Sequence, residues 1–256
     1  MKFKQLRFAN RYGYKLAARI DLPDDGTPHA YAIFAHCFTC TKNLKAVAAI
    51  NQTLTQDGIA VLRFDFTGLG QSEGDFADTN FTTNVSDIVD AAEFLADQYA
   101  TPRMLIGHSL GGAAVLQAAV DIPSARAVVT IAAPSRPDHV LKHFSDATEE
   151  IETRGEAEVR LAGRPFRIKK QFLENLGADP MTDTIKGLNR ALLVLHAPLD
   201  DIVGIGNAGE IFQTAKHPKS FVSLDSADHL LTDPDDARYA GGVMAAWCRR
   251  YIIGDR

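Results

Sequence analysis

The sequence predicts an α/β protein built on a mostly parallel, doubly wound sheet that begins with an antiparallel hairpin. Six short runs are rich in Val, Ile, Leu, Phe and Ala and lack period-2 polarity, which is typical of strands buried on both faces of a parallel sheet. Longer stretches of helical character separate these runs, as in α/β proteins. Two segments at the start alternate polar and apolar residues instead, as strands with one exposed face do.

The elements follow one another in a regular order. The two alternating segments, about 2–9 and 14–21, are expected to form the hairpin at one edge of the sheet. The buried strands are expected at Ala30–Ala35, Ile59–Phe64, Arg103–Ile106, Ala127–Ile131, Ala191–Leu195 and Ser220–Leu224. The helices are expected at about 42–57, 80–99, 110–120, 204–214 and 235–252. Thr79 and Asp235 are the N-caps that the sequence suggests for the second and the last helix.

One stretch, about 134–185, interrupts this alternation because it contains no run typical of a buried strand. It holds a charged, helix-like part at Asp138–Glu152, a small hairpin that turns at Gly163-Arg164, and a short helix that ends near Leu176. An insertion after a sheet strand, at the carboxyl edge, is where a lid over a binding crevice would lie. We therefore expect one domain over residues 1–256 with a lid at about 134–185; a simple surface excursion is the alternative.

Composition excludes several classes of protein. A net charge of −5 gives no electrostatic basis for binding nucleic acid or an anionic membrane. No apolar run approaches the roughly 18 residues that span a bilayer, and residues 1–23 lack the apolar region of a signal peptide. The three cysteines, Cys37, Cys40 and Cys248, suggest no disulfide framework, so a cytoplasmic location is expected. Nothing in the sequence calls for a cofactor or a metal ion.

The strongest chemical signal is the segment Gly107–Gly112, which reads Gly-His-Ser-Leu-Gly-Gly. It matches the pattern G-x-S-x-G and lies directly between an expected strand and an expected helix. Glycines at these positions allow a tight, strained turn that exposes the serine hydroxyl above the sheet edge, next to free amide donors at the helix start. The pattern therefore predicts that Ser109 is a nucleophile, against the alternative of a glycine-rich turn with a surface serine.

A serine nucleophile needs a base, and the base needs a group that orients it. Among the eight histidines, His229 is best placed, because it lies in a loop between the last expected strand and the last helix. Asp200 and Asp201 follow the expected strand Ala191–Leu195, which comes earlier in the chain than His229. We choose Asp200 as the orienting acid and expect Asp201 to cap the following turn. The order Ser109, Asp200, His229 is the one expected when the serine lies on such a turn.

An oxyanion hole would complete the site. One donor is expected to be the backbone N–H of Leu110, which follows the nucleophile in the chain. The second is expected from the loop after Ala30–Ala35, where Phe38 N–H is the choice.

With these residues assigned, the sequence resembles the α/β-hydrolase superfamily, and more narrowly the hydrolase part of bacterial fusions with a C-terminal OsmC-type peroxide-handling domain. The segments that carry the resemblance start at His36 (HCFTCTK), Arg63 (RFDFTGLGQSEGDF), Gly107 (GHSLGG) and Arg154 (RGEAEVRLAGRPF). The resemblance implies the α/β-hydrolase fold with a lid, an esterase with the residues named above, and a possible OsmC-type partner domain in fused relatives. Two positions depart from the superfamily pattern: Cys37 stands where glycine is usual, and Thr67 where arginine is usual.

The function expected is hydrolysis of carboxylic esters, short-chain or aryl, through an acyl-enzyme on Ser109. The absence of a strongly cationic stretch favours small, neutral, partly apolar esters. Thioesterase, lipase-like and perhydrolase chemistry remain open, because the same three residues could carry them. Cys37 and Cys40 form a C-x-x-C motif, which leaves a redox protein as a weaker alternative. The sequence does not indicate an oligomeric state.

Overall fold

A computed structural model of the chain describes residues 1–161, 163–177 and 181–253. Ala162 and residues 178–180, which fall in the expected lid, lie outside the described residues. The model contains an eight-stranded sheet with the order β1-β2-β4-β3-β5-β6-β9-β10. These strands span Lys2–Ala9 (β1), Lys15–Leu22 (β2), Ala30–Ala35 (β3), Ile59–Phe64 (β4), Met104–His108 (β5), Ala127–Ile131 (β6), Ala191–His196 (β9) and Lys219–Ser223 (β10). The predicted fold class is confirmed: β1 and β2 pair antiparallel at one edge, and β3, β4, β5, β6, β9 and β10 run parallel to one another.

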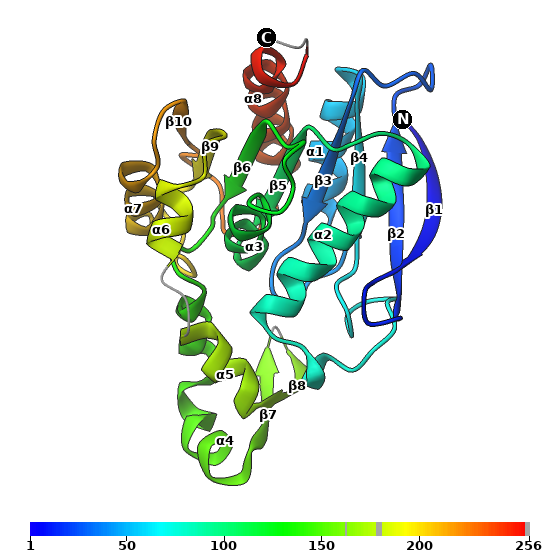
Figure 1. The fold of residues 1–256 in the computed structure, drawn as a ribbon. Coiled ribbons are helices and arrows are strands. Elements are labelled where there is room, and N and C mark those ends of the chain that lie inside the picture. The colour runs from blue at the N-terminus through cyan, green and yellow to red at the C-terminus, as the bar shows by residue number, and fades with distance from the viewer. Residues whose placement is uncertain (162, 178–180, 254–256) are drawn as a thin grey trace.

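Helices cover both faces of this sheet and make a three-layer arrangement (Figure 1). α2 (Phe81–Gln98) and α3 (Leu110–Ala118) lie on one face, while α1 (Lys45–Gln56) and α8 (Pro234–Ile252) pack together on the other. Each face has its own apolar core, and the sheet is buried between the two because side chains of its central strands enter both. α7 (Gly206–Thr214) packs beside β9 and β10.

Several helix starts differ from the prediction by one or two residues. The N-cap of α2 is Asn80 rather than Thr79, because Asn80 and Thr83 form a reciprocal capping box. The N-cap of α8 is Asp233 rather than Asp235, since its carboxylate accepts a hydrogen bond from the Asp235 N–H and Pro234 occupies the first turn. The last strand, β10, was expected to be buried on both faces. It is half-exposed instead, because it lies at the edge of the sheet.

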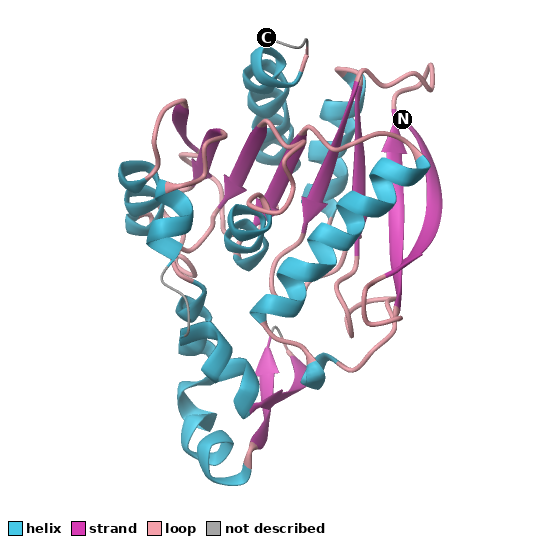
Figure 2. Cartoon of the chain, viewed as in Figure 1, coloured by secondary structure: helices cyan, strands magenta, loops and turns pink. Residues whose placement is uncertain are grey.

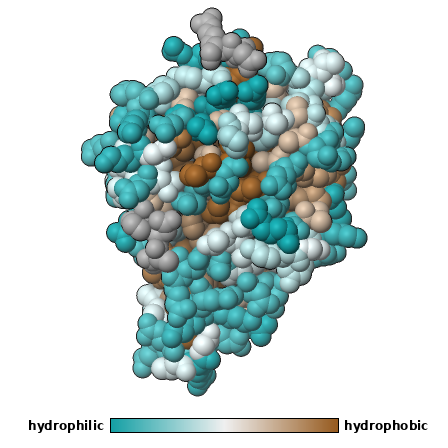
Figure 3. Space-filling model, viewed as in Figure 1, coloured by the Kyte–Doolittle hydropathy of each residue, from teal (hydrophilic) through white to brown (hydrophobic). Residues whose placement is uncertain are grey.

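The segment between β6 and β9 lies apart from the sheet. It contains 3₁₀ turns at Pro137–Ala147, α4 (Thr148–Arg154), a two-stranded hairpin of β7 (Glu156–Leu161) and β8 (Arg164–Lys169), α5 (Lys170–Gly177) and α6 (Met181–Lys186). The arrowheads of the central strands point toward this segment, so it lies at the carboxyl edge of the sheet (Figure 2). Its outer surface is mostly hydrophilic, whereas apolar residues gather over the middle of the same face (Figure 3).

The parallel register brings the strand ends together at this edge. Ala35 of β3 is aligned with Gly107 of β5, and His108 is aligned with Ile131 of β6. The loops that follow β3, β5, β6 and β9 therefore open side by side, which is the position where ligands bind in open α/β sheets.

Candidate active site

Ser109 occupies a strained turn between β5 and α3. Its backbone has φ 54° and ψ −126°, in a region that side chains rarely adopt. The neighbouring glycines make this turn possible, because a Cβ on Gly107 would lie 2.2 Å from the Gly111 carbonyl oxygen, and one on Gly111 would lie 2.4 Å from the His36 carbonyl oxygen. The turn presents the hydroxyl at the carboxyl edge of the sheet, beside the first amide groups of α3.

The structure brings Ser109, His229 and Asp200 together although they come from three separate loops. Ser109 Oγ lies 3.1 Å from His229 Nε2, and His229 Nδ1 lies 2.8 Å from Asp200 Oδ2. All three residues are largely buried, with exposed fractions of 9%, 8% and 5%. This geometry lets the serine hydroxyl donate to one ring nitrogen while the other donates to the carboxylate.

Asp200 is also fixed by the loop that carries it. Its Oδ1 accepts hydrogen bonds from the N–H groups of Ile202 and Val203, at 2.9 and 2.8 Å. Burial acts to raise the pKa of Asp200, but the hydrogen bonds from His229 and these amides outweigh it and the pKa is lowered. Asp200 therefore stays ionised. The expectation that Asp201 caps this turn is wrong, because Asp200 does so and Asp201 is exposed.

His108 holds the backbone of His229 through a hydrogen bond that was not predicted from the sequence. Its Nε2 donates to the His229 carbonyl oxygen at 2.7 Å, and the two rings lie 5.2 Å apart. Burial, and then the nearby charge of His229, lower the pKa of His108 to about 3. His108 is therefore neutral near pH 7 and places no second positive charge beside His229. Its position next to Ser109 in the motif was visible, but its partner lies 121 residues further along the chain.

The loop after β3 lies beside Ser109 in the lining of the same pocket. Neither Phe38 N–H nor Leu110 N–H has a protein acceptor among the described residues. His36 donates from Nδ1 to the Cys37 carbonyl oxygen at 2.8 Å. Thr39 has a positive φ of 60°, so the chain turns sharply there. Phe38 in this loop and Leu110 at the start of α3 therefore each offer an unpaired amide, and both residues line the same pocket as Ser109.

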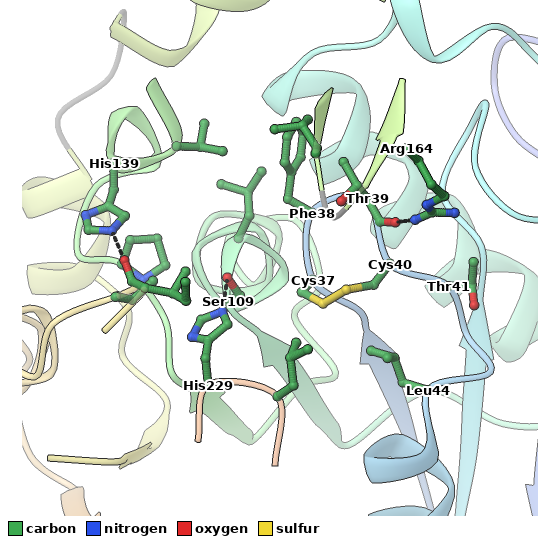
Figure 4. Close-up of a pocket in the computed structure, with 17 residues that line it drawn as sticks. Cys37, Phe38, Thr39, Cys40, Thr41, Leu44, Ser109, His139, Arg164 and His229 are labelled. Carbon is green, nitrogen blue, oxygen red and sulfur yellow. Dashed lines mark hydrogen bonds between the residues drawn. A yellow bond between two sulfur atoms is a disulfide. The ribbon is translucent and has the colours of Figure 1, made fainter. Parts of the chain in front are cut away.

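Cys37 and Cys40 are joined by a disulfide, which corrects the expectation that the cysteines form none. The turn with Cys40 N–H bonded to the Cys37 carbonyl oxygen brings the two Cα atoms to 5.3 Å, within the range that a disulfide spans. The disulfide lies beside Ser109 (Figure 4). Cys248 is free and buried in the opposite layer.

A buried ion pair anchors the far end of this loop. Lys42 Nζ lies 2.6 Å from Asp65 Oδ2, and both side chains are almost fully buried. Asp65 also accepts the backbone N–H of Lys42 at 2.7 Å and that of Gln71 at 3.0 Å. Asp65 thus connects the end of the β3 loop to the turn after β4. In the sequence, Asp65 stands out only as part of the segment that starts at Arg63 and resembles the α/β-hydrolase superfamily.

A pocket of about 620 Å³ opens at Ser109 and His229. It is mostly apolar, and its walls come from the β3 loop, the β6 loop, the loop after β9 and the tip of the β7–β8 hairpin. Its lining includes Phe38, Ser109, Leu110 and His229. Figure 4 shows Ser109 and His229 between the disulfide on one side and His139 on the other. The described part of the chain has no group of three or more His, Cys, Asp or Glu side chains that could hold a metal ion.

Residues 27–185 match the family model Hydrolase_4, described as "Serine aminopeptidase, S33". This match covers more than half of the chain. The protein belongs to this α/β-hydrolase family. The chain is similar over 99% of its length to the esterase domain of a Rhodothermus marinus protein, which it covers completely. The two are 53% identical, with a TM-score of 0.81. The chain also shares the fold of Est1E from Butyrivibrio proteoclasticus, whose structure has ferulic acid bound. The TM-score is 0.82 at 20% identity, over 94% of this chain and 98% of Est1E.

Curated relatives of this Hydrolase_4 protein include the palmitoyl-protein thioesterase ABHD10, mitochondrial. The protein from Rattus norvegicus is 30% identical over 128 residues, which cover 48% of this chain and 42% of the relative. The human protein is 25% identical over 182 residues, which cover 67% of this chain and 57% of the relative. The chain thus spans about half the length of the curated relatives it matches. Among the described residues, no helix has both the length and the apolar character needed to cross a membrane.

Proposed function

We propose that the protein hydrolyses carboxylic esters with a short acyl chain or an aryl group, through an acyl-enzyme on Ser109. One observation carries the proposal: Ser109, His229 and Asp200 form a continuous hydrogen-bonded chain, and Ser109 and His229 line an apolar pocket. The similarity to an esterase domain over the whole chain supports the reaction class.

In the proposed mechanism, His229 Nε2 takes the proton of Ser109 as Oγ attacks the ester carbonyl carbon. The resulting oxyanion accepts hydrogen bonds from Phe38 N–H and Leu110 N–H, which have no protein acceptor among the described residues. His229 then gives its proton to the leaving alkoxide, and the acyl group stays on Oγ. A water molecule repeats these steps: His229 takes its proton, and the carboxylic acid leaves as Oγ regains a proton. Asp200 remains ionised and stabilises the charged imidazole.

A thioester is the second candidate substrate, because curated relatives of this chain are named palmitoyl-protein thioesterases. The proposed steps are the same, with a thiolate as the leaving group. The pocket gives no reason to prefer one bond over the other, since Ser109 and His229 line it and would act on either.

The test is a matched pair of substrates, phenyl butyrate and S-phenyl thiobutyrate, together with p-nitrophenyl esters from acetate to palmitate and a feruloyl ester. We expect highest kcat/KM for short-chain or aryl oxygen esters. Activity confined to long chains, or to the thioester, would replace the esterase proposal with a lipase or a thioesterase.

Ser109→Ala is the matched control. It should lower hydrolysis to the residual level that binding and the oxyanion hole provide, a loss of several powers of ten. A fluorophosphonate should label the wild type and not this variant. If the wild type is neither labelled nor active on any ester, the site binds ligands without acyl transfer.

A further inference from the structure

The tip of the β7–β8 hairpin places a cation in the wall of the pocket. Leu161 and Arg164 are cross-strand partners at this tip, and both line the pocket. Arg164 Nη2 donates a hydrogen bond to the Thr39 carbonyl oxygen, in the loop after β3. Figure 4 shows Arg164 and Thr39 on one side of Ser109 and His139 on the other.

The charge of Arg164 is not neutralised by the protein. The cations that follow on β8 are paired, Arg167 with Asp75 and Lys169 with Asp78. In the part of the chain that the structure describes, no carboxylate lies within 4.0 Å of Arg164. Of the described residues that line the pocket, no other is a lysine, arginine, aspartate or glutamate.

The guanidinium also keeps donors available. It carries five N–H groups, and the structure uses one of them for the Thr39 carbonyl. The Phe166 ring, 5.4 Å from the guanidinium carbon, contributes a cation–π contact that holds the group without neutralising it. An unpaired, planar set of donors at the edge of an apolar pocket matches a carboxylate, which accepts two parallel hydrogen bonds from arginine.

We propose that Arg164 determines substrate specificity by binding a carboxylate of the substrate. This proposal rests on the ester hydrolysis proposed above. Pro134, Val140 and Ile202 are among the apolar residues that line the same pocket. A preferred substrate therefore has an apolar half and a half that ends in a carboxylate, with the ester bond between them at Ser109. This refines the expectation of neutral esters, which came from the composition of the whole chain and could not place one cation in the pocket.

Two pairs of esters test this proposal and show which half carries the carboxylate. On the acyl side, mono-4-nitrophenyl adipate is compared with 4-nitrophenyl adipamate, its neutral amide. On the alcohol side, 4-butanoyloxybenzoate is compared with 4-butanoyloxybenzamide. Wild type should prefer the anionic member of one pair by about tenfold in kcat/KM, the order expected for a charge-assisted contact that remains partly exposed.

Arg164→Gln should abolish this preference through KM, because glutamine keeps amide donors but has no charge. Arg164→Lys should restore part of it. Arg167→Gln is the matched control on the same strand and should keep the preference, since Arg167 does not line the pocket. An unchanged anion-to-amide ratio in Arg164→Gln would overturn the proposal. So would an equal loss in kcat on all four esters, because Arg164 would then act only by holding the Thr39 loop.

A binding measurement separates this proposal from the proposed reaction. Ser109→Ala should bind the anionic ester of the preferred pair about tenfold more tightly than the amide, and adding Arg164→Gln should remove the difference. If wild type hydrolyses none of the esters but this binding difference is found, the reaction is wrong and the anion site stands. If the esters are hydrolysed and no binding difference is found, the reaction stands and the anion site is wrong.

Discussion

Exchange of Asp200 for asparagine should separate the roles of the two adjacent aspartates. In Asp200→Asn the side-chain oxygen can still accept from Ile202 and Val203, so the loop should keep its shape. The amide nitrogen would face His229 Nδ1, however, and a donor there forces the ring proton onto Nε2. His229 would then direct a proton toward Ser109 and could not act as its base.

The size of the effect follows from the geometry. The 2.8 Å contact places the charge centres of the carboxylate and the imidazolium about 4 Å apart. At the effective dielectric constant of protein sites this attraction is worth about 4 kcal/mol. Its loss corresponds to about a thousandfold in rate, and the wrong tautomer adds to that.

The assay is kcat/KM on p-nitrophenyl butyrate, with thermal unfolding to show that the variant is folded. Asp201→Asn is the matched control, because Asp201 is exposed and should change the rate little. A folded Asp200→Asn variant with a rate within tenfold of wild type would refute the assignment of the acid. A large loss in Asp201→Asn would move the role to that residue.

Two further predictions concern the cysteines and the buried histidines. Cys37→Ser/Cys40→Ser should keep its kcat on a short-chain ester within a few-fold and should not respond to thiol reagents; a fall as deep as that of the nucleophile variant would place the sulfur atoms in the mechanism. Burial lowers the pKa of His36 to about 4 and of His108 to about 3, whereas it raises that of Asp87 to about 6. Near pH 5 the unfolded chain therefore binds about two more protons than the folded chain at the two histidines, and about one fewer at Asp87. The net difference is about one proton. Through these three groups the free energy of unfolding therefore falls by about 1.4 kcal/mol per pH unit as the pH falls from about 6 to 4. Urea unfolding of a folded His108→Gln variant should show most of this slope removed, and an unchanged slope would contradict it.

The sequence predicted the central sheet well for a physical reason. The runs at β3, β4 and β6 are rich in apolar residues without a period-2 alternation, and the structure gives them the bounds that the sequence indicated. The edge strand β10 was harder, because a short mixed run does not reveal whether one of its sides is exposed. Helix starts were uncertain by one or two residues wherever several capping residues stand together, as at Thr79 and Asn80.

The three loops of the candidate site could be found because each follows a recognisable strand. The chain order then selected Ser109, Asp200 and His229, which the structure brings within hydrogen-bonding distance. The contacts that hold them were not predictable in this way. His108 contacts a carbonyl 121 residues away, and Arg164 contacts one 125 residues away. Local patterns carry no information about such distances.

The loop after β3 shows what this means for the site. In the sequence, the only visible feature of this loop is that Cys37 replaces the usual glycine. In the structure the loop is held at several points by groups from separate parts of the chain. Besides the disulfide, the contacts are those of His36 with the Cys37 carbonyl, Lys42 with Asp65, and Arg164 with the Thr39 carbonyl. Because three of these contacts need no sulfur, the loop should keep Phe38 N–H in place when both cysteines are replaced by serine. That is the physical reason to expect the double variant to remain active.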